Sequence, residues 1–362
     1  GGNAVFASGS TTTADDNILV QTGDDIIVQA GATVTSANNP SVAPDPLDPF
    51  NGVGALQLQA GGLANLLSVP FTPIASLIVD GTLNSNTGAI IASANAIDGL
   101  GGTFSGSSIA LDITDAPGAG GTQDNDAGLL TANCVEGNIC IGNIVADNVI
   151  EIGENSNNDV IQLIVEQGNV NANEIRITTS EDIVMGTNGI ATTLTAADVF
   201  SATSTTGDVN LFDTAITSDL ILIGAAGSLL GSASLSSTND IGITVGDSIT
   251  LASLNAGGEL TQVADVGGAL EGSYSVAGSI NIGSLITGAG DINYDAGGDI
   301  ILGDVNAGIN DVILDAGELA SISAGVTASN LSITANAIQI TNVTVPGDID
   351  LVSDTTLELG TL

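Results

Sequence analysis

Oxygen donors on two loops are the first residues of this chain that could do chemistry. Asp124, Asn125 and Asp126 stand together in QDNDAG, and Asp45 and Asp48 stand in PDPLDPFNG. Hard cations such as Ca²⁺ bind clusters of carboxylate and amide oxygens. Neither segment has the spacing of an EF-hand or of a G-G-x-G-x-D calcium repeat, so carboxylates of solvated turns are the alternative. Calcium is therefore the one cofactor that the sequence suggests.

Catalytic groups are harder to assemble from this sequence. Asp295 and Asp299 could in principle share the acid and base work of glycoside hydrolysis, but both are turn residues of a repeating phrase. The chain has no His, and its single basic residue is Arg176 in NEIRITT. Arg176 shares one face with Glu174 if this segment is a strand, which predicts a surface ion pair. We expect no enzymatic activity.

Two cysteines lie close together in CVEGNIC. A local disulfide between Cys134 and Cys140, across a turn at Gly137 and Asn138, would indicate an oxidising compartment. The alternative is that both are small buried hydrophobic residues. Two thiols without a His are too few ligands for a structural zinc site.

The charge balance excludes several classes of partner. The formal net charge is −40, because 41 acidic residues stand against one basic residue. A basic patch cannot be built, so binding to nucleic acid or to an anionic membrane surface is not expected. The apolar fraction of 43% exceeds that of disordered chains. The most apolar segment, Leu220 to Gly231, is too short and too rich in Gly for a membrane-spanning helix.

One short phrase recurs along the chain. It begins with Gly, Asn or Ser, continues with Asp or a substitute, and then alternates aliphatic with polar residues. Strict alternation over five to seven residues is typical of a half-buried strand. Copies of the phrase include GDDIIVQA (Gly23–Ala30), NDVIQLIV (Asn158–Val165), SDLILIG (Ser218–Gly224), NDIGITV (Asn239–Val245), GDINYDA (Gly290–Ala296), GDIILGD (Gly298–Asp304) and NDVILDA (Asn310–Ala316).

The spacing of the phrase decides between all-β architectures. Copies begin 8 to 12 residues apart in places and about 20 residues apart elsewhere. Immunoglobulin-like modules would instead repeat every ~100 residues and carry a core Trp, which this chain lacks. A period of about 20 predicts a parallel β-solenoid, or β-helix, whose coils carry two or three strands each. We expect residues 1–362 to form a single solenoid.

Departures from the phrase predict loops. Residues 36–73 contain six of the eight prolines, and residues 115–128 are rich in Gly. Proline cannot donate to a sheet ladder, so both segments are expected to leave the coil stack. The phrase also weakens over residues 257–272. The start lacks a Met or a signal-like segment, so the chain is read as an excerpt of a longer precursor or as a filament protomer.

Two side-chain roles are expected within the stack. Asp at the first position of a strand is predicted to cap its own turn through its own backbone. Asn can also form hydrogen-bonded ladders from coil to coil. The residues expected to do so are Asn306, Asn310, Asn330 and Asn336.

The segment GDINYDAGGDIILGDVNAG, from Gly290 to Gly308, resembles the repeats of filamentous-haemagglutinin-type large exoproteins. Related units such as GDVNLFD and GDIDLVS extend the resemblance over about the last two thirds of the chain. The resemblance implies a right-handed parallel β-helix that is secreted and that serves in adhesion, biofilm or surface-fibre formation. The family's repeats carry no catalytic residues, so none is transferred.

These observations lead to one functional hypothesis and two alternatives. The hypothesis is an extracellular or cell-surface structural rod, an adhesin or exoprotein that binds host or surface glycans or proteins. The first alternative is a self-assembling filament or surface-layer subunit whose partner is itself, joined end to end or laterally. The second is a polysaccharide-active β-helix enzyme. No partner is expected among nucleic acids, and no insertion into a membrane is expected.

Overall fold

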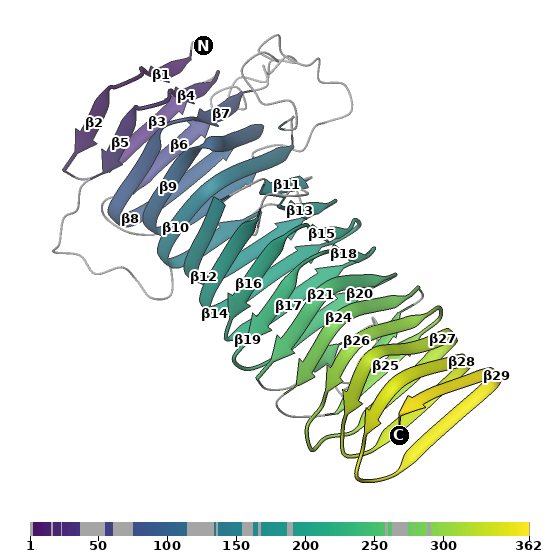
Figure 1. The fold of residues 1–362 in the computed structure, drawn as a ribbon. Helices are drawn as coiled ribbons and strands as arrows, with labels where there is room; N and C mark the ends of the chain where they lie inside the picture. Colours follow the sequence, from purple (N-terminus) through teal and green to yellow (C-terminus); the bar gives the residue numbers. More distant parts are fainter. Residues whose placement is uncertain are drawn as a thin grey trace, which may run out of the picture. The chain divides into compact units, whose positions relative to one another are not determined.

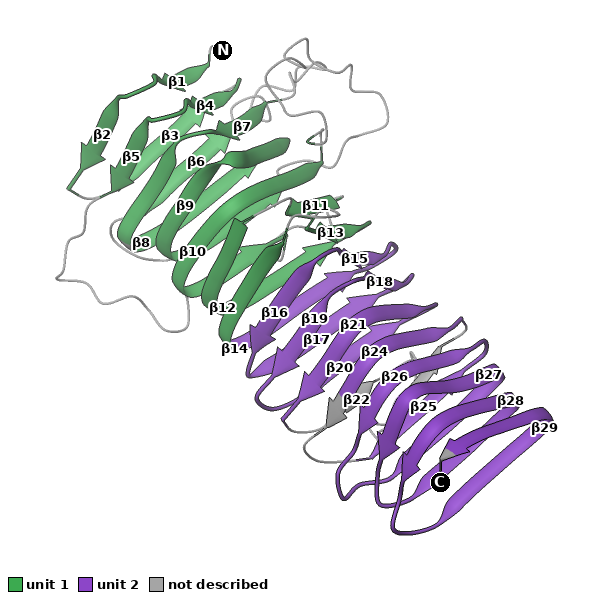
Figure 2. Ribbon diagram, in the orientation of Figure 1, with its two compact units in different colours: residues 1–197 green, residues 198–362 purple. Residues whose placement is uncertain are grey.

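The structure of the chain is a computed structural model in which nearly every described residue belongs to a strand or a short turn (Figure 1). It describes residues 3–15, 17–22, 24–36, 55–60, 75–113, 134, 137–153, 162–165, 168–186, 191–257, 260–262, 274–276, 278–287 and 291–361. Contacts divide the chain into two compact units, Gly1–Ala197 and Asp198–Leu362 (Figure 2).

Unit 1 consists of parallel strands of 3 to 18 residues. Its first strand, for example, pairs with β4, which pairs in turn with β7. Its strands are β1 (Ala4–Phe6), β2 (Thr11–Ala14), β3 (Ile18–Thr22), β4 (Ile26–Val28), β5 (Thr33–Ser36), β6 (Leu56–Ala60), β7 (Ser76–Val79), β8 (Thr82–Ala94), β9 (Ala96–Ile113), β10 (Asn138–Ile152), β11 (Gln162–Val165), β12 (Gly168–Thr179), β13 (Ile183–Met185) and the first part of β14 (Thr192–Ser204).

Unit 2 is also built from parallel strands, and its strands recur at more regular intervals along the chain. Its strands, after the second part of β14, are β15 (Val209–Leu211), β16 (Thr214–Ser218), β17 (Leu220–Ala225), β18 (Leu229–Gly231), β19 (Ser234–Ser237), β20 (Ile241–Val245), β21 (Ile249–Ala256), β22 (Leu260–Gln262), β23 (Tyr274–Val276), β24 (Ile280–Thr287), β25 (Ile292–Ala296), β26 (Ile300–Asn306), β27 (Val312–Thr327), β28 (Leu331–Thr344) and β29 (Ile349–Thr361).

The pairing pattern defines the fold class. In unit 2, β17, β18 and β19 make one coil, and the next coil stacks on it in parallel, β20 on β17 and β21 on both β18 and β19. The first of these coils thus carries three strands and the next carries two, within the two or three that the sequence predicts. The fold class is all-β, the described residues contain no helix, and they form about 12 turns of parallel β-solenoid. The predicted fold class is confirmed, while the right-handed sense of the coil stays a prediction.

The core follows from alternation within each strand. Ile292 of β25, Val312 of β27 and Leu331 of β28 are register partners in three successive coils, and all three are buried. The residues that follow them in the same strands point outward, as the period of two requires. Burying each such aliphatic side chain contributes about 1.5–3 kcal/mol, so one coil gains stability by stacking on the next.

A close approach of successive coils explains one glycine. Gly231, at the end of β18, has a φ of 138°, which side chains disfavour. A Cβ atom there would lie 2.0 Å from the carbonyl oxygen of Leu211 in the preceding coil. Only glycine fits this corner without moving the backbone.

The predicted loop segments are described only in part. Within residues 36–73, Leu56–Ala60 forms β6, which pairs with β3 and β8 and therefore belongs to the stack. Within residues 257–272, β22 pairs with β20. Residues 37–54, 61–74 and 115–128 lie outside the described residues. The single domain over 1–362 and the two excursions stay predictions. Nowhere in the described part of the chain is there a helix long and apolar enough to cross a bilayer.

Among the described residues of unit 2, Tyr294 has the largest fully buried side chain. It points inward from β25 and is fully buried. Burial raises the pKa of its phenol far above the ordinary value, because the ionised form would lose its hydration.

The burial of Tyr294 predicts that the free energy of unfolding falls at alkaline pH mainly because of this one residue. The folded pKa is raised, so the contribution of Tyr294 to stability is complete below the unfolded pKa of about 10 and declines above it, by about 1.4 kcal/mol per pH unit. The chain has no Lys, no free Cys among its described residues and only two Tyr, so few other groups titrate there. We expect urea unfolding midpoints to fall between pH 10 and 12 for the wild type, and by clearly less for Tyr294→Phe. Equal losses in both proteins would contradict the burial of this phenol.

Candidate functional site

Among the described side chains, those at the corners between strands make the hydrogen bonds that recur from coil to coil. One series, which we call the first corner ladder, joins six successive coils of unit 2 through five hydrogen bonds. Each side-chain oxygen accepts a hydrogen bond from a backbone N–H in the next coil. The pairs are Asp208 Oδ1 with Ser228 N (2.7 Å), Ser228 Oγ with Ser248 N (3.2 Å), Ser248 Oγ with Ser279 N (3.1 Å), Ser279 Oγ with Asp299 N (3.0 Å) and Asp299 Oδ1 with Leu319 N (3.1 Å).

A second corner ladder runs along another corner of unit 2. Asp291 Oδ1 accepts from Asp311 N at 2.8 Å, and Asp311 Oδ1 accepts from Asn330 N at 3.1 Å. Asn330 Oδ1 in turn accepts from Asp348 N at 2.9 Å, and its Nδ2 donates back to Asp311 Oδ1 at 2.7 Å. The first two donors lie 20 and 19 residues after their acceptors, which is the length of one coil.

The corner ladders show a role for Asp that the sequence did not predict. Asp208, Asp291 and Asp311 each accept a hydrogen bond from a backbone amide of the next coil, in addition to any capping of their own turn, which stays a prediction. The reason is geometric: the next coil presents its amide at the same corner, within reach of a short side chain.

The four Asn residues fall into two pairs. Asn330 bridges coils in the second corner ladder, and Asn336 Nδ2 donates to the carbonyl of Gly317, 19 residues earlier, at 2.7 Å. Asn306 and Asn310 instead bond within one turn, to Gly308 N and Ala307 O. The ladder prediction therefore holds for two of the four.

Asp295 and Asp299, the carboxylate pair considered for acid–base chemistry, occupy different structural positions. The carboxylate of Asp299 caps Leu319 in the first corner ladder. Asp295 lies exposed in β25, beside its register partner Asp315. Their positions assign Asp299 a stacking role and leave Asp295 on an outer sheet face.

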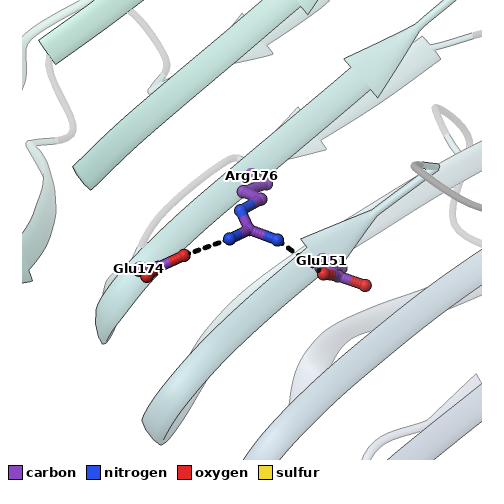
Figure 3. Close-up of polar contacts among 3 residues, drawn as sticks. All are labelled: Glu151, Glu174 and Arg176. Atoms are coloured by element: carbon purple, nitrogen blue, oxygen red, sulfur yellow. Dashed lines mark hydrogen bonds and ion pairs between the residues drawn. The ribbon is translucent and has the colours of Figure 1, made fainter. Parts of the chain in front are cut away.

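Arg176 forms the predicted surface ion pair. Its guanidinium contacts Glu174, two residues earlier in β12, and Glu151 in β10 at 3.0 Å (Figure 3). Glu151 and Arg176 are register partners, so the pair bridges two neighbouring strands. The side chain of Arg176 is 39% exposed, which places this ion pair in the class that contributes at most about 1 kcal/mol.

The calcium candidates Asp45, Asp48, Asp124, Asn125 and Asp126 lie outside the described residues. In the part of the chain that the structure describes, no group of three or more His, Cys, Asp or Glu side chains is arranged to hold a metal ion. Calcium binding by the two loops stays a prediction.

Cys134 and Cys140 are joined by a disulfide, with their Cα atoms 5.8 Å apart. Gly137, between them in the sequence, has a φ of 87°, a left-handed conformation that favours glycine. Both cysteines are buried and pack with Ile164, and Leu100 lies against this small cluster.

Sequence reasoning missed where this cluster lies. Cys140 and Ile164 are register partners in β10 and β11, and their neighbours Ile139 and Leu163 belong to the core, so Cys140 and Ile164 face outward. A signal was present in the sequence, because SLIV, NICI and QLIV each end in three consecutive apolar residues instead of alternating apolar and polar ones. Such runs are typical of strands that are buried on both faces.

Comparison with known proteins adds no relative. The chain matches no protein-family model, no curated protein and no solved structure. The functional argument therefore rests on the residues and on their arrangement.

The second corner ladder predicts the effect of a single substitution. Asp311→Ala removes the acceptor of two hydrogen bonds from Asn330, which should lower the free energy of unfolding by about 1–2 kcal/mol. The matched control is Asp315→Ala, four residues later, where the exposed carboxylate faces that of Asp295; its effect should stay within about 0.5 kcal/mol. Urea unfolding and hydrogen exchange at the Asn330 amide measure the effects of both substitutions. If the two variants behave alike, the corner ladder does not hold the coils together.

Proposed function

We propose that this chain is an extracellular structural and adhesive β-solenoid, a segment of a surface adhesin or exoprotein rod. The observation that carries the proposal is the in-register stacking of parallel coils, which corner side chains in unit 2 cap onto one another. Such a scaffold extends by repetition and presents flat sheet faces along its length, which suits a protein that holds a binding surface at a distance.

The compartment is inferred from sulfur chemistry. Disulfides persist in secreted and surface proteins and are rare in the reducing cytosol. The Cys134–Cys140 bond therefore supports an extracellular or cell-surface location. The resemblance of the repeats to filamentous-haemagglutinin-type exoproteins supports the same location.

The partner class is inferred from the outer faces. One face of unit 2 carries a row of short polar side chains in register, Ser234 beside Ser253 and Ser236 beside Asn255. Hydroxyl and amide groups of this kind can hydrogen-bond to glycans or to polar protein surfaces. The net charge of −40 disfavours acidic partners, so neutral glycans or proteins with basic patches are the partners proposed.

Two measurements on the purified chain test this proposal. Electron microscopy should show separate elongated particles, and beads coated with the chain should bind immobilised glycans or surface proteins saturably, with soluble chain as competitor and heat-unfolded chain as control. Regular fibres without any such binding would favour the alternative, a self-assembling filament or surface-layer subunit. Glycan hydrolysis that disappears after an Asp→Asn change in one loop would replace both with an enzyme.

A further inference from the structure

Unit 1 carries a column of side chains on the outside of its sheet, and all are apolar except Asp98, whose carboxylate accepts a hydrogen bond from the backbone N–H of Leu100. We call this column the outer strip. Neighbouring members are register partners in adjacent strands, and the residues before and after each member point into the core. The members are Ile27, Ile78, Asp98, Cys140, Ile164 and Val184.

The middle of the outer strip is buried although it faces outward. Ile78 is 5% exposed, Cys140 0% and Ile164 9%. In unit 2, the outward-facing Leu222 is 41% exposed and Ile313 is 39% exposed. A strand with both faces apolar and buried is expected only where a second layer covers the sheet. The outer strip is therefore covered at its centre.

Cys134 and Leu100 contribute to that cover. Cys134 lies outside any strand, is 1% exposed, and packs on Cys140 and Ile164 together with Leu100. The disulfide holds Cys134 in this position over the strip, since its partner Cys140 is itself a member of the strip. The covering residue is thus attached covalently to the surface that it covers.

We propose that the Cys134–Cys140 disulfide is a redox latch over the outer strip. In the oxidised chain Cys134 is held down and the strip is closed. A dithiol reductant supplies two electrons and two protons: the S–S bond breaks, both cysteines become thiols, and the reductant closes its own disulfide. Cys134 is then free to leave, which exposes Cys140, Ile164 and Leu100 to water.

Because both cysteines are buried, the disulfide of the folded chain is harder to reduce than it is to form. Thiol–disulfide exchange requires the attacking thiolate to reach a sulfur atom, and here both cysteines are essentially inaccessible. Reduction of the folded chain must therefore wait for local opening of this region. A chain that is made reduced keeps an open apolar strip until oxidation closes it, and afterwards the latch stays closed. This inference does not depend on the proposed adhesive function.

Reduction of the folded full-length chain tests the latch. The purified protein is treated with dithiothreitol without denaturant, and alkylation with mass spectrometry follows the appearance of two thiols. We expect hydrogen exchange in residues 138–141 and 162–165 to accelerate by about tenfold or more once the thiols appear. The apolar dye ANS should bind at the same time. Residues 241–245 of unit 2 serve as the internal control and should not change.

Two variants separate a latch from a simple cross-link. Cys134→Ala and Cys140→Ala should each show the accelerated exchange and the dye binding without any reductant, while residues 241–245 keep their wild-type protection. If either variant fails to fold, reduction of the folded wild type decides alone. Complete reduction without faster hydrogen exchange in these residues and without dye binding would overturn the proposal. The disulfide would then only cross-link the chain and would cover no surface.

Discussion

Every coil of this protein depends on its neighbours for its hydrogen bonds. In a parallel solenoid the backbone N–H and C=O groups of one coil pair with the coils before and after it, and no coil can satisfy them alone. This constraint fixes the register of neighbouring coils. The register in turn stacks residues of the same kind on one another. Aliphatic side chains therefore form continuous columns, as Ile292, Val312 and Leu331 do. Corners that come too close to the next coil accept only glycine, as at Gly231.

The same constraint explains how an acidic chain with a single basic residue can fold. A net charge of −40 opposes compaction, and the described part of the chain offers one Arg to offset it. Many carboxylates stand instead at corners, where Asp208, Asp291 and Asp311 accept hydrogen bonds from backbone amides of the next coil. A carboxylate paired with an N–H dipole is stabilised without any cation. The acidic residues thereby become part of the stacking itself.

Much of the fold could be predicted from the sequence, because the signals that set it are local. Alternation in GDINYDA and its relatives identifies strands, and the repeat of about 20 residues identifies the solenoid. The disulfide was accessible to the same reasoning, since Cys134 and Cys140 flank a Gly turn. The partner of each corner Asp could not be read, because it depends on which residue lies one coil away, and that is a property of the register.

The outer strip could not be predicted from the sequence for a different reason. The apolar runs SLIV, NICI and QLIV were visible, but a search for alternation assigns half of each run to the core and leaves the other half unexplained. Only the register shows that Ile78, Cys140 and Ile164 stand in one column on the outside. A sequence search for strands that break alternation in successive repeats would have found this column.

Register is therefore the property on which the whole structure depends, and paired cysteines can measure it directly. Ser236 and Asn255 are outward-facing register partners in β19 and β21, whereas Ser236 and Ser253 are diagonal neighbours. Partners across a sheet are separated by about 4.8 Å and diagonal residues by about 7–8 Å, and disulfides form only at the shorter spacing. Mild oxidation should cross-link the double variant Ser236→Cys/Asn255→Cys and leave Ser236→Cys/Ser253→Cys largely unlinked. Preferential cross-linking of the diagonal pair would contradict the register and the stacking argument built on it.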